Sequence, residues 1–445
     1  TVEDLKTRLG LARLPDEENQ RYNTLSGMLM LLLARLPATG DIVQWGDWTF
    51  EIVDMDGKRI DKVLVQRRPT EAADEFSMSR PEESAPALAE GLKTVRGLIE
   101  KVAASDLPPL SRNNVLFELR AKESQFNTAL RQALGLSLLA VVVPERLSGN
   151  GFRGLGETFQ SAVPGQHFKV SVQLTNQSSA EISVREVSLR AAEDDDWTLE
   201  TGDITAGPLK DNGTMQVNFE VDVPEAPTFT KPYFSRPGIH QDYYDIEDAR
   251  YQSLTHRPYP LAAWATVEFR GVPFQMGQAV QTVERITGLG TVLNPLVVVP
   301  SISVSISPNA GITRLDSDQF RLSVKIQSNV KGPANGSVRL NLPSGWKSEP
   351  DRVPFATVRD GEQQSVDFQV FPANLAELRY EVTAVAEYEG KEYTAGFHTA
   401  GYSGLRPYNL YREATYSSRG VDVKTAPDLR IGYIMGSGDS VPDSM

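Results

Sequence analysis

The sequence has 445 residues, and at roughly 150 residues per domain this length predicts about three domains rather than one compact unit. Apolar residues make up 40% and charged residues 23% of the chain, values that exclude the disordered, collagen-like and membrane-spanning classes of protein. The net charge of −13 argues against binding to nucleic acid, and the absence of cysteine excludes disulfides, thiolate metal sites and cysteine nucleophiles.

The apolar runs of the chain are too short to cross a membrane. The longest, at residues 28–34 and 138–143, fall well below the roughly 20 apolar residues that a membrane helix needs. The N-terminus also lacks a basic segment followed by an apolar one, so no secretory signal is visible. We therefore expect no direct insertion into a membrane.

Residues 1–69 have the pattern of a small α+β module. A helix is predicted over residues 2–9, with Thr1 as its N-cap, and the apolar helix over residues 28–33 must be covered by a sheet. Short β-rich runs, separated by Gly-Asp and Asp-Gly turns, supply that sheet at residues 41–45, 48–53 and 60–65. The prediction is two helices followed by three antiparallel strands.

Motifs of this module carry a resemblance to a known family. They are Tyr22-Asn23-Thr24-Leu25-Ser26-Gly27, Leu36-Pro37-Ala38-Thr39-Gly40-Asp41 and Asp56-Gly57-Lys58-Arg59-Ile60-Asp61-Lys62-Val63. In this order they resemble the transporter-associated domain of the CorC/HlyC family over nearly all of residues 1–69. The resemblance implies a domain at the cytoplasmic end of a membrane protein, after a pair of CBS modules, with a fold similar to part of a flavin-binding domain.

The role predicted for this module is regulatory docking, without chemistry of its own. The membrane region and the CBS modules are absent from the sequence, so transport is not expected of this chain alone. A flavin cofactor is not expected either, because the segment has no long glycine-rich loop for a pyrophosphate. The module should fold independently, because residues 70–86 are rich in Glu, Ala, Ser and Pro and have the composition of a linker.

Residues 70–140 are predicted to form that linker and a helical hairpin. Apolar residues recur at helical spacing from Leu88 to Val102 and from Leu116 to Leu138, on either side of a break at residues 106–109. We interpret the apolar stripe of the hairpin as a face buried against the neighbouring domain, with a partner-binding groove as the alternative.

From residue 141 the hydrophobic period changes to two, which is typical of β-sandwiches. Two immunoglobulin-like sandwiches are predicted, the first with a connector rich in proline and aromatics at residues 141–300 and the second at residues 301–402. The turn over residues 343–346 places the indole of Trp346 at a strand end, where it should plug the second sandwich.

The connector between the sandwiches combines aromatic and basic side chains. The candidate contacts for a glycan or a protein partner are Tyr233, Phe234, Arg236, Tyr243, Tyr244, Arg257 and Tyr259. Aromatic faces stack on sugars, and Arg and Tyr are enriched at protein interfaces. The alternative is that these rings wedge the two sandwiches together.

Further motifs carry a second resemblance, which together with the connector covers residues 86–445. They are Asn294-Pro295-Leu296-Val297-Val298-Val299-Pro300, Leu342-Pro343-Ser344-Gly345-Trp346, Gly404-Leu405-Arg406-Pro407-Tyr408 and Gly420-Val421-Asp422-Val423-Lys424. They resemble the accessory region that follows the catalytic domain in large bacterial LmbE-like (PIG-L) deacetylases. The resemblance implies a zinc-dependent hydrolase that removes acetyl groups from N-acetylated sugars through a His-Pro-Asp-Asp motif.

That catalytic motif is absent from this sequence. The histidines of the chain are isolated, without the i+3 to i+5 spacing of a metal site, at His167, His240, His256 and His398. A lone general acid-base residue supplies only part of the rate enhancement of an enzyme. We therefore predict no catalytic, metal-binding or cofactor-binding residues in this chain.

Residues 403–445 are predicted to be the truncated start of an α/β domain, which by resemblance would be similar to a glutamine amidotransferase. Residues 429–435 have the pattern of a first strand, and Gly436-Ser437-Gly438 that of the turn after it. No helix is predicted between this turn and Met445.

The function predicted from the sequence is a noncatalytic accessory or binding region of an LmbE-like deacetylase, joined to a regulatory transporter-associated module. The alternative is the regulatory C-terminal domain of a CorC/HlyC-type ion transporter or hemolysin-like protein. The first predicts an exported or cell-envelope location, and the second the cytoplasmic face of a membrane. A joining of separate coding sequences and a natural arrangement both stay open.

Overall fold

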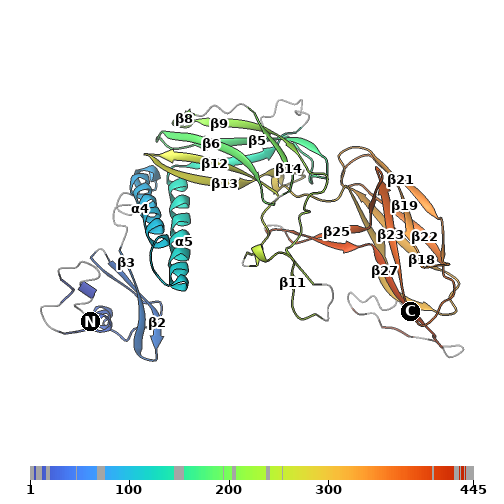
Figure 1. Cartoon of the computed structure of the whole chain (residues 1–445), viewed down its shortest axis with the longest axis horizontal. Helices are drawn as coiled ribbons and strands as arrows, with labels where there is room; N and C mark the ends of the chain where they lie inside the picture. The colour runs from blue at the N-terminus through green and yellow to red at the C-terminus, as the bar shows by residue number, and fades with distance from the viewer. Residues whose placement is uncertain are drawn as a thin grey trace.

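The protein is built from several parts that follow one another in chain order. The computed structural model describes residues 5–6, 13–16, 21–46, 48–67, 76–144, 155–193, 195–202, 207–236, 241–252, 254–402, 405–424, 430, 432–434 and 436. Figure 1 shows an N-terminal module, a helical hairpin and two β-sandwiches, with a connector between the sandwiches. The predicted multidomain and mainly β fold is confirmed.

The N-terminal module packs one described helix on a sheet. Its elements are α2 (Leu25–Leu33), β1 (Ile42–Trp45), β2 (Trp48–Asp56) and β3 (Arg59–Arg67). The strands pair antiparallel in the order β1-β2-β3. Thr24 caps the helix, because its hydroxyl accepts a hydrogen bond of 3.1 Å from the Gly27 amide.

This module has a hydrophobic core of its own. Met28 and Leu29 of α2 are fully buried in one cluster with Phe50 and Ile52 of β2. The described members of this cluster all come from residues 5–65. The opening helix predicted over residues 2–9 lies mostly outside the described residues.

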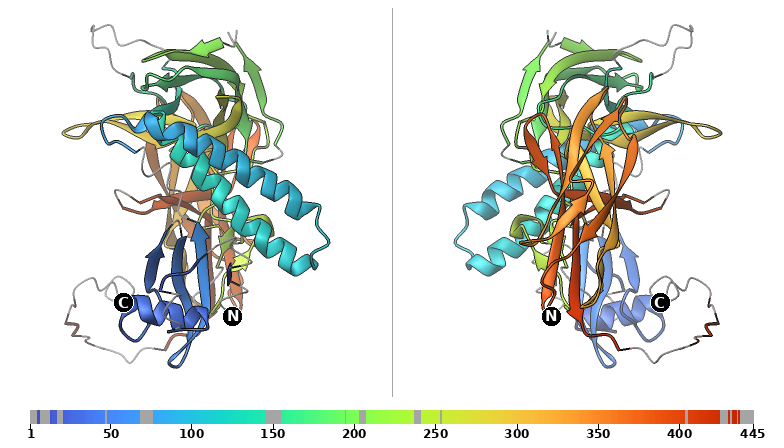
Figure 2. Two further views of the ribbon diagram at one scale, coloured as in Figure 1. Left: turned by 90° about the vertical axis from the view of Figure 1, so that its left-hand side faces the viewer. Right: turned by 90° about the vertical axis from the view of Figure 1, so that its right-hand side faces the viewer.

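The two long helices form an antiparallel hairpin, and Figures 1 and 2 show them side by side. They are α4 (Ala85–Ala103), preceded by the 3-10 turn η2 (Pro81–Ser84), and α5 (Pro109–Ala133). Gly91 lets the helices approach closely, because a Cβ there would lie 2.4 Å from the ring of Phe126. Arg96 and Glu123 add an ion pair of 2.7 Å between the helices.

One end of the hairpin is packed against the first sandwich. Of the predicted stripe, Leu92, Leu130 and Leu134 share the sandwich core, and Leu88 and Phe126 pack against it. The interpretation of the stripe as a domain-facing surface is confirmed for these residues, whereas Leu98 is exposed. The placement of Leu138 on the second helix is wrong, because Gly135 adopts a left-handed φ of 55° that ends the helix, and Leu138 lies on a strand.

The first sandwich consists of two sheets. One has the order β15-β14-β4-β5-β9-β7. Its strands are β4 (Leu136–Val142), β5 (His167–Asn176), β7 (Thr198–Thr201), β9 (Thr214–Asp222), β14 (Gln281–Ile286) and β15 (Gly290–Pro295). The other has the order β13-β12-β6-β8. Its strands are β6 (Ile182–Ala191), β8 (Gly207–Leu209), β12 (Leu261–Phe269) and β13 (Val272–Ala279).

The second sandwich has the same two-sheet plan. One sheet has the order β16-β18-β22-β20. Its strands are β16 (Ile302–Ser307), β18 (Phe320–Ser328), β20 (Lys347–Glu349) and β22 (Gln363–Phe371). The other has the order β17-β27-β23-β19-β21, with β24 (Lys391–Tyr393) paired to β23. Its strands are β17 (Ala310–Arg314), β19 (Ala334–Asn341), β21 (Arg352–Thr357), β23 (Arg379–Tyr388) and β27 (Thr415–Val421).

Trp346 plugs the second sandwich as predicted. Its side chain belongs to the buried cluster between the sheets, and its indole N–H donates to the Ala373 carbonyl at 3.1 Å. The rings of Phe320 and Tyr380 lie 5.8 and 5.0 Å from the indole. The indole thus fills the end of the sandwich while its only polar group is satisfied.

The connector and a two-stranded hairpin lie between the sandwiches. The connector contains β10 (Phe234–Ser235), β11 (Asp245–Ile246) and the 3-10 turn η3 (Ala249–Tyr251). A separate two-stranded hairpin, β25 (Ala395–Ala400) and β26 (Tyr408–Glu413), leaves the second sandwich and returns to it. Figure 1 shows β11 and β25 in the region between the two sandwiches.

The segment after residue 403 contributes to the second sandwich. Strand β27 pairs with β17 and β23, and its alternate residues Tyr416, Ser418 and Gly420 are buried. This strand lies within the range 403–445, where the start of an α/β domain was predicted. Of the first strand of that domain, predicted at residues 429–435, the described residues 430 and 432–434 are not in a strand, and the glycine turn after it lies mostly outside the described residues.

Candidate functional site

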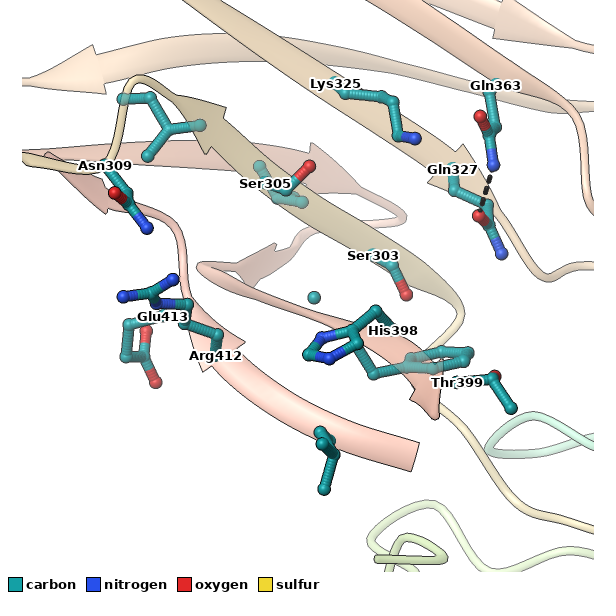
Figure 3. A pocket seen from close by; sticks show the side chains of 15 residues that line it. Ser303, Ser305, Asn309, Lys325, Gln327, Gln363, His398, Thr399, Arg412 and Glu413 are labelled. Atoms are coloured by element: carbon teal, nitrogen blue, oxygen red, sulfur yellow. Dashed lines mark hydrogen bonds between the residues drawn. The ribbon is translucent and has the colours of Figure 1, made fainter. Parts of the chain in front are cut away.

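A polar groove of about 440 Å³ lies between the second sandwich and the β25–β26 hairpin. Figure 3 shows its labelled side chains around a common space, with Ser303 and Ser305 along one strand. Its polar lining is Ser303, Ser305, Asn309, Lys325, Gln327, Gln363, His398, Thr399, Arg412 and Glu413. A cavity of this size is in the range of small-ligand sites.

One wall of the groove is the outward face of a sheet. Strand pairing places Ser303 beside Gln327 and Gln327 beside Gln363, so that these three side chains form a row across β16, β18 and β22. The amides of Gln363 and Gln327 are joined by a hydrogen bond of 2.8 Å, which holds both in place. Alternation along each strand keeps the apolar residues on the opposite face, in the core.

The opposite wall is the β25–β26 hairpin. Gly396 lets this hairpin lie directly against β16, because a Cβ at this position would be 2.5 Å from the Val304 carbonyl oxygen. The hairpin contributes Phe397, His398 and Arg412 to the groove. The groove therefore combines amides, hydroxyls and charged groups with one aromatic ring.

A second cavity, of about 220 Å³, lies on the connector side of the same hairpin. Phe397 and Thr399 line both this cavity and the polar groove. The guanidinium of Arg406 lies 3.6 Å from the ring centre of Tyr259 and donates to the Arg257 carbonyl at 2.7 Å. Through these two contacts the turn of the hairpin packs against the connector at this cavity.

Burial shifts the pKa values of the groups around the second cavity. Because it disfavours the charged form, burial raises the pKa of Tyr259 and lowers the pKa of Arg406. His256 stacks on Tyr408, with ring centres 5.0 Å apart and ring planes inclined by 5°. Burial, and then the charge of Arg406, lower the pKa of His256, so this imidazole is neutral at pH 7.

Four of the seven predicted contact residues are buried or half-buried and contact other parts of the chain. Tyr233 is buried, and its hydroxyl donates to the Leu254 carbonyl at 2.7 Å. Phe234 packs edge-on against Tyr408 of β26. The remaining two are Arg257, which is 2.6 Å from Glu193, and Tyr259, which lies under Arg406.

The other three predicted contact residues are exposed on the connector. Tyr243 and Tyr244 have exposed fractions of 68% and 56%, and Arg236 is also exposed. The structure does not bring these three residues into the lining of the polar groove. The Tyr244 ring contacts Phe234 with ring centres 5.4 Å apart.

The histidines of the chain occupy unrelated positions. His398 lines the polar groove, His256 lines the second cavity, and His167 lies on the first sandwich beside Asp222. His240 lies outside the described residues. Across the part of the chain that the structure describes, no group of three or more His, Asp or Glu side chains has the geometry to hold a metal ion. In the same part, no helix is long and apolar enough to span a bilayer.

Sequence reasoning missed the polar groove. Its residues come from three strands and a hairpin that are far apart along the chain, and none forms a local motif. The alternating pattern of residues 320–328 does show that Lys325 and Gln327 face outward. What the pattern does not show is that a hairpin some 70 residues later covers this face.

Comparisons with known proteins give two separate family matches. Residues 1–69 match the CorC_HlyC model, described as a transporter associated domain, and residues 317–389 match a model described as the NPCBM-associated, NEW3 domain of alpha-galactosidase. The polyamine export protein of Haemophilus influenzae is 39% identical over 64 residues, which are 14% of this chain and 14% of that protein. That of Escherichia coli K12 is 34% identical over 71 residues, which are 16% of this chain and 15% of that protein.

Two solved structures that align with this chain have low scores. The secreted serine protease VesC from Vibrio cholerae aligns with 60% of this chain and 54% of its own, at 9% identity and a TM-score of 0.22. The C-terminal domain of the Streptococcus agalactiae AgI/II polypeptide BspA aligns with 64% of this chain and 100% of its own, at 11% identity and a TM-score of 0.24. At scores this low, neither likeness carries an argument.

The matches support the resemblance of residues 1–69 to the CorC/HlyC family, but they do not show the resemblance of residues 86–445 to LmbE-like deacetylases. Within the region expected to resemble LmbE-like deacetylases, the matching model is the NEW3 domain. The two polyamine export proteins match over 64 and 71 residues, and the chain covers about 14–15% of their length. Residues 1–69 are a transporter-associated domain of the CorC/HlyC type, as expected from their motifs.

Proposed function

We propose that this chain is a noncatalytic binding region for a glycan, joined to a regulatory transporter-associated module. The observation that carries the proposal is the polar groove between β16 and the β25–β26 hairpin. The groove offers several amides and hydroxyls on a rigid sheet, and it also has an aromatic ring, Phe397. Sugar rings present hydroxyl groups to donors and acceptors, and they present C–H faces to aromatic rings, so this mixture suits a glycan.

The NEW3 match gives the proposal its substrate class. The matched segment, residues 317–389, contains Lys325, Gln327 and Gln363, which form the sheet wall of the groove. The description of this model names alpha-galactosidase, so oligosaccharides of galactose are the first glycans to test.

The test is a calorimetric titration of the whole chain with a galacto-oligosaccharide. Gln363→Ala removes hydrogen bonds from the groove wall, and we expect it to weaken binding by about 3- to 10-fold. The matched control is Gln369→Ala, on the same strand but outside the groove lining. Equal affinity of wild type and Gln363→Ala, or loss of binding in both variants, would contradict the proposed site.

The exposed connector residues Arg236, Tyr243 and Tyr244 are proposed as a second contact surface for the glycan or a protein partner. Their support is exposure combined with aromatic character. Tyr243→Ala and Tyr244→Ala should then weaken retention on a glycan resin without changing the melting temperature. A fall in melting temperature without any change in retention would instead show that the rings only hold the connector in place.

A finer proposal is that the β-rich part accompanies an LmbE-like deacetylase. Its support is the set of sequence motifs between residues 294 and 424. In this role the chain itself needs neither zinc nor deacetylase activity. Metal analysis that finds one tightly held zinc per chain, or acetate release from N-acetylglucosamine derivatives, would contradict the noncatalytic assignment.

The second candidate function is regulation of a CorC/HlyC-type transporter by residues 1–69. The observation that favours it is the match of this module to polyamine export proteins. Grafting residues 1–69 in place of the matching segment of the Haemophilus influenzae exporter should preserve polyamine export, whereas deletion of that segment should reduce it. A graft that behaves like the deletion would contradict a regulatory role of this kind.

A further inference from the structure

The polar groove has an excess of positive groups. Lys325 of β18 and Arg412 of β26 are both exposed in its lining, together with the imidazole of His398 and the carboxylate of Glu413. Figure 3 shows Lys325 on one side of the open space and His398 and Arg412 on the other. A ligand in the groove therefore meets cations from both walls.

Among the described residues, no acidic side chain forms an ion pair with Lys325. Strand pairing places Ser305 of β16 and Ser365 of β22 on either side of it, so both of its cross-strand neighbours are uncharged. Arg321, on the same strand and face, is by contrast ion-paired with Asp367. Within the described part of the chain, the Lys325 ammonium has no ion pair or hydrogen bond of its own.

Arg412 is in a similar position on the hairpin wall. Its partner across the hairpin is Gly396, which has no side chain, and Glu413 lies opposite Ala395. Among the described residues, no ion pair joins the Arg412 guanidinium to Glu413 or to another carboxylate. In the described part of the chain, the register of two separate sheets thus leaves two cations of one groove without an ion-pair partner.

We infer that the polar groove selects glycans that carry carboxylate groups, such as chains of uronic acid. This inference rests on the proposed glycan binding and specifies its substrate class. A sugar carboxylate would accept charge-assisted hydrogen bonds from Lys325 and Arg412, while hydroxyls of the same chain contact the amides of Gln327 and Gln363. Because both cations are exposed, each contact is worth about a 2- to 5-fold gain in affinity.

The net charge of the chain opposes this selection only at long range. The whole protein carries a charge of −13, which repels polyanions at a distance. At physiological ionic strength the screening length is about 8 Å, so this repulsion is largely screened, whereas contacts inside the groove are shorter than that length. The measurement therefore belongs at about 150 mM salt, which is close to the physiological ionic strength.

The test uses α-1,4-linked oligomers of galacturonic acid and the same oligomers after methyl esterification, titrated calorimetrically into the whole chain. Esterification removes the charge and keeps the sugar ring, and we expect it to weaken binding by about 5-fold or more. Lys325→Gln and Arg412→Gln should each weaken binding of the acid by about 2- to 5-fold, and each should weaken binding of the acid more than binding of the ester. Glu413→Gln should strengthen binding of the acid. Lys347→Gln, on β20 outside the groove, is the matched control and should have no effect.

The outcomes separate this inference from the proposed function. Equal affinity for acid and ester would overturn the selection of carboxylates and leave glycan binding in place. An absence of binding by the acid, the ester and neutral galacto-oligosaccharides would overturn both. An oligoglutamate of equal charge that binds as tightly as the uronate would show recognition of charge alone, and would overturn the assignment to a sugar. Melting temperatures of all variants establish that a loss of affinity is not a loss of fold.

Discussion

His167 lies between two carboxylates on the exposed surface of the first sandwich. Its Nδ1 is 2.7 Å from Asp222, and its Nε2 is 3.1 Å from Glu220. The hydrogen bond with Asp222 is the main reason that the pKa of His167 is raised above 6.5. Nothing in the sequence near His167 indicated this contact, because Asp222 lies 55 positions later and is brought opposite by the pairing of β5 with β9.

The raised pKa of His167 predicts that the free energy of unfolding depends on pH. The contacts of protonated His167 with the two carboxylates stabilise the folded state fully below the unfolded-state pKa of about 6.5. This stabilisation is lost as the pH rises through the higher folded-state pKa. We predict that Asp222→Asn lowers the pKa of His167, as measured by NMR titration of the imidazole protons. His256, whose pKa is lowered by burial, serves as the internal reference. A His167 titration that is identical in wild type and Asp222→Asn would disprove this electrostatic account.

At the scale of elements, the helical hairpin contains a matched pair of glycines. Gly91 faces the ring of Phe126, whereas Gly97, also in α4, has no heavy atom within 4 Å of where its Cβ would lie. Gly97→Ala should stabilise the protein by about 0.5–1 kcal/mol through helix propensity alone. Gly91→Ala should not be stabilising, because the Phe126 ring must move to make room for the added methyl group. We expect its free energy of unfolding to be about 1–3 kcal/mol lower than that of Gly97→Ala. Chemical denaturation of both variants measures the difference, and equal stabilities would show that α4 and α5 are not tightly packed at Gly91.

The elements were predictable to different degrees for physical reasons. The amphipathic helices and alternating strands bury one face, and this leaves a periodic pattern that sequence alone reveals. The end of α5 was misplaced because Leu134 and Leu138 continue the helical spacing, although Gly135 breaks the helix between them. The β25–β26 hairpin was missed because its strands pair only with each other and carry little apolar alternation, as the half-exposed stretch 395–400 shows.

At the scale of the whole molecule, the N-terminal module should behave as an independent unit. Its buried residues form a cluster that contains no described member from the hairpin or the sandwiches. We predict that residues 1–69 expressed alone melt cooperatively, and that the full chain shows this transition separately from that of the sandwiches. A disordered peptide would contradict autonomy, and a copurifying yellow chromophore would contradict the expectation that the module binds no flavin.

The polar groove is formed by strands of the second sandwich and a hairpin that lies later in the chain, and this explains why sequence reasoning predicted the multidomain, mainly β fold but not the groove. Lys325 and Gln363 lie on neighbouring strands of one sheet, yet His398 and Arg412 reach them only because Gly396 lets the hairpin lie against β16. The connector cluster was visible in the sequence because it is local and rich in aromatics. Part of that cluster instead packs against the β25–β26 hairpin, as Tyr259 does against Arg406 and Phe234 against Tyr408.

A crystal structure of the whole chain soaked with a galactose-based oligosaccharide tests the central claim most directly. Our account predicts sugar density in the polar groove, within hydrogen-bonding distance of Gln327, Gln363 and His398, while the β25–β26 hairpin stays against β16. Density on the exposed tyrosines Tyr243 and Tyr244 alone, or an empty groove in crystals under a ligand concentration that saturates binding in solution, would contradict it.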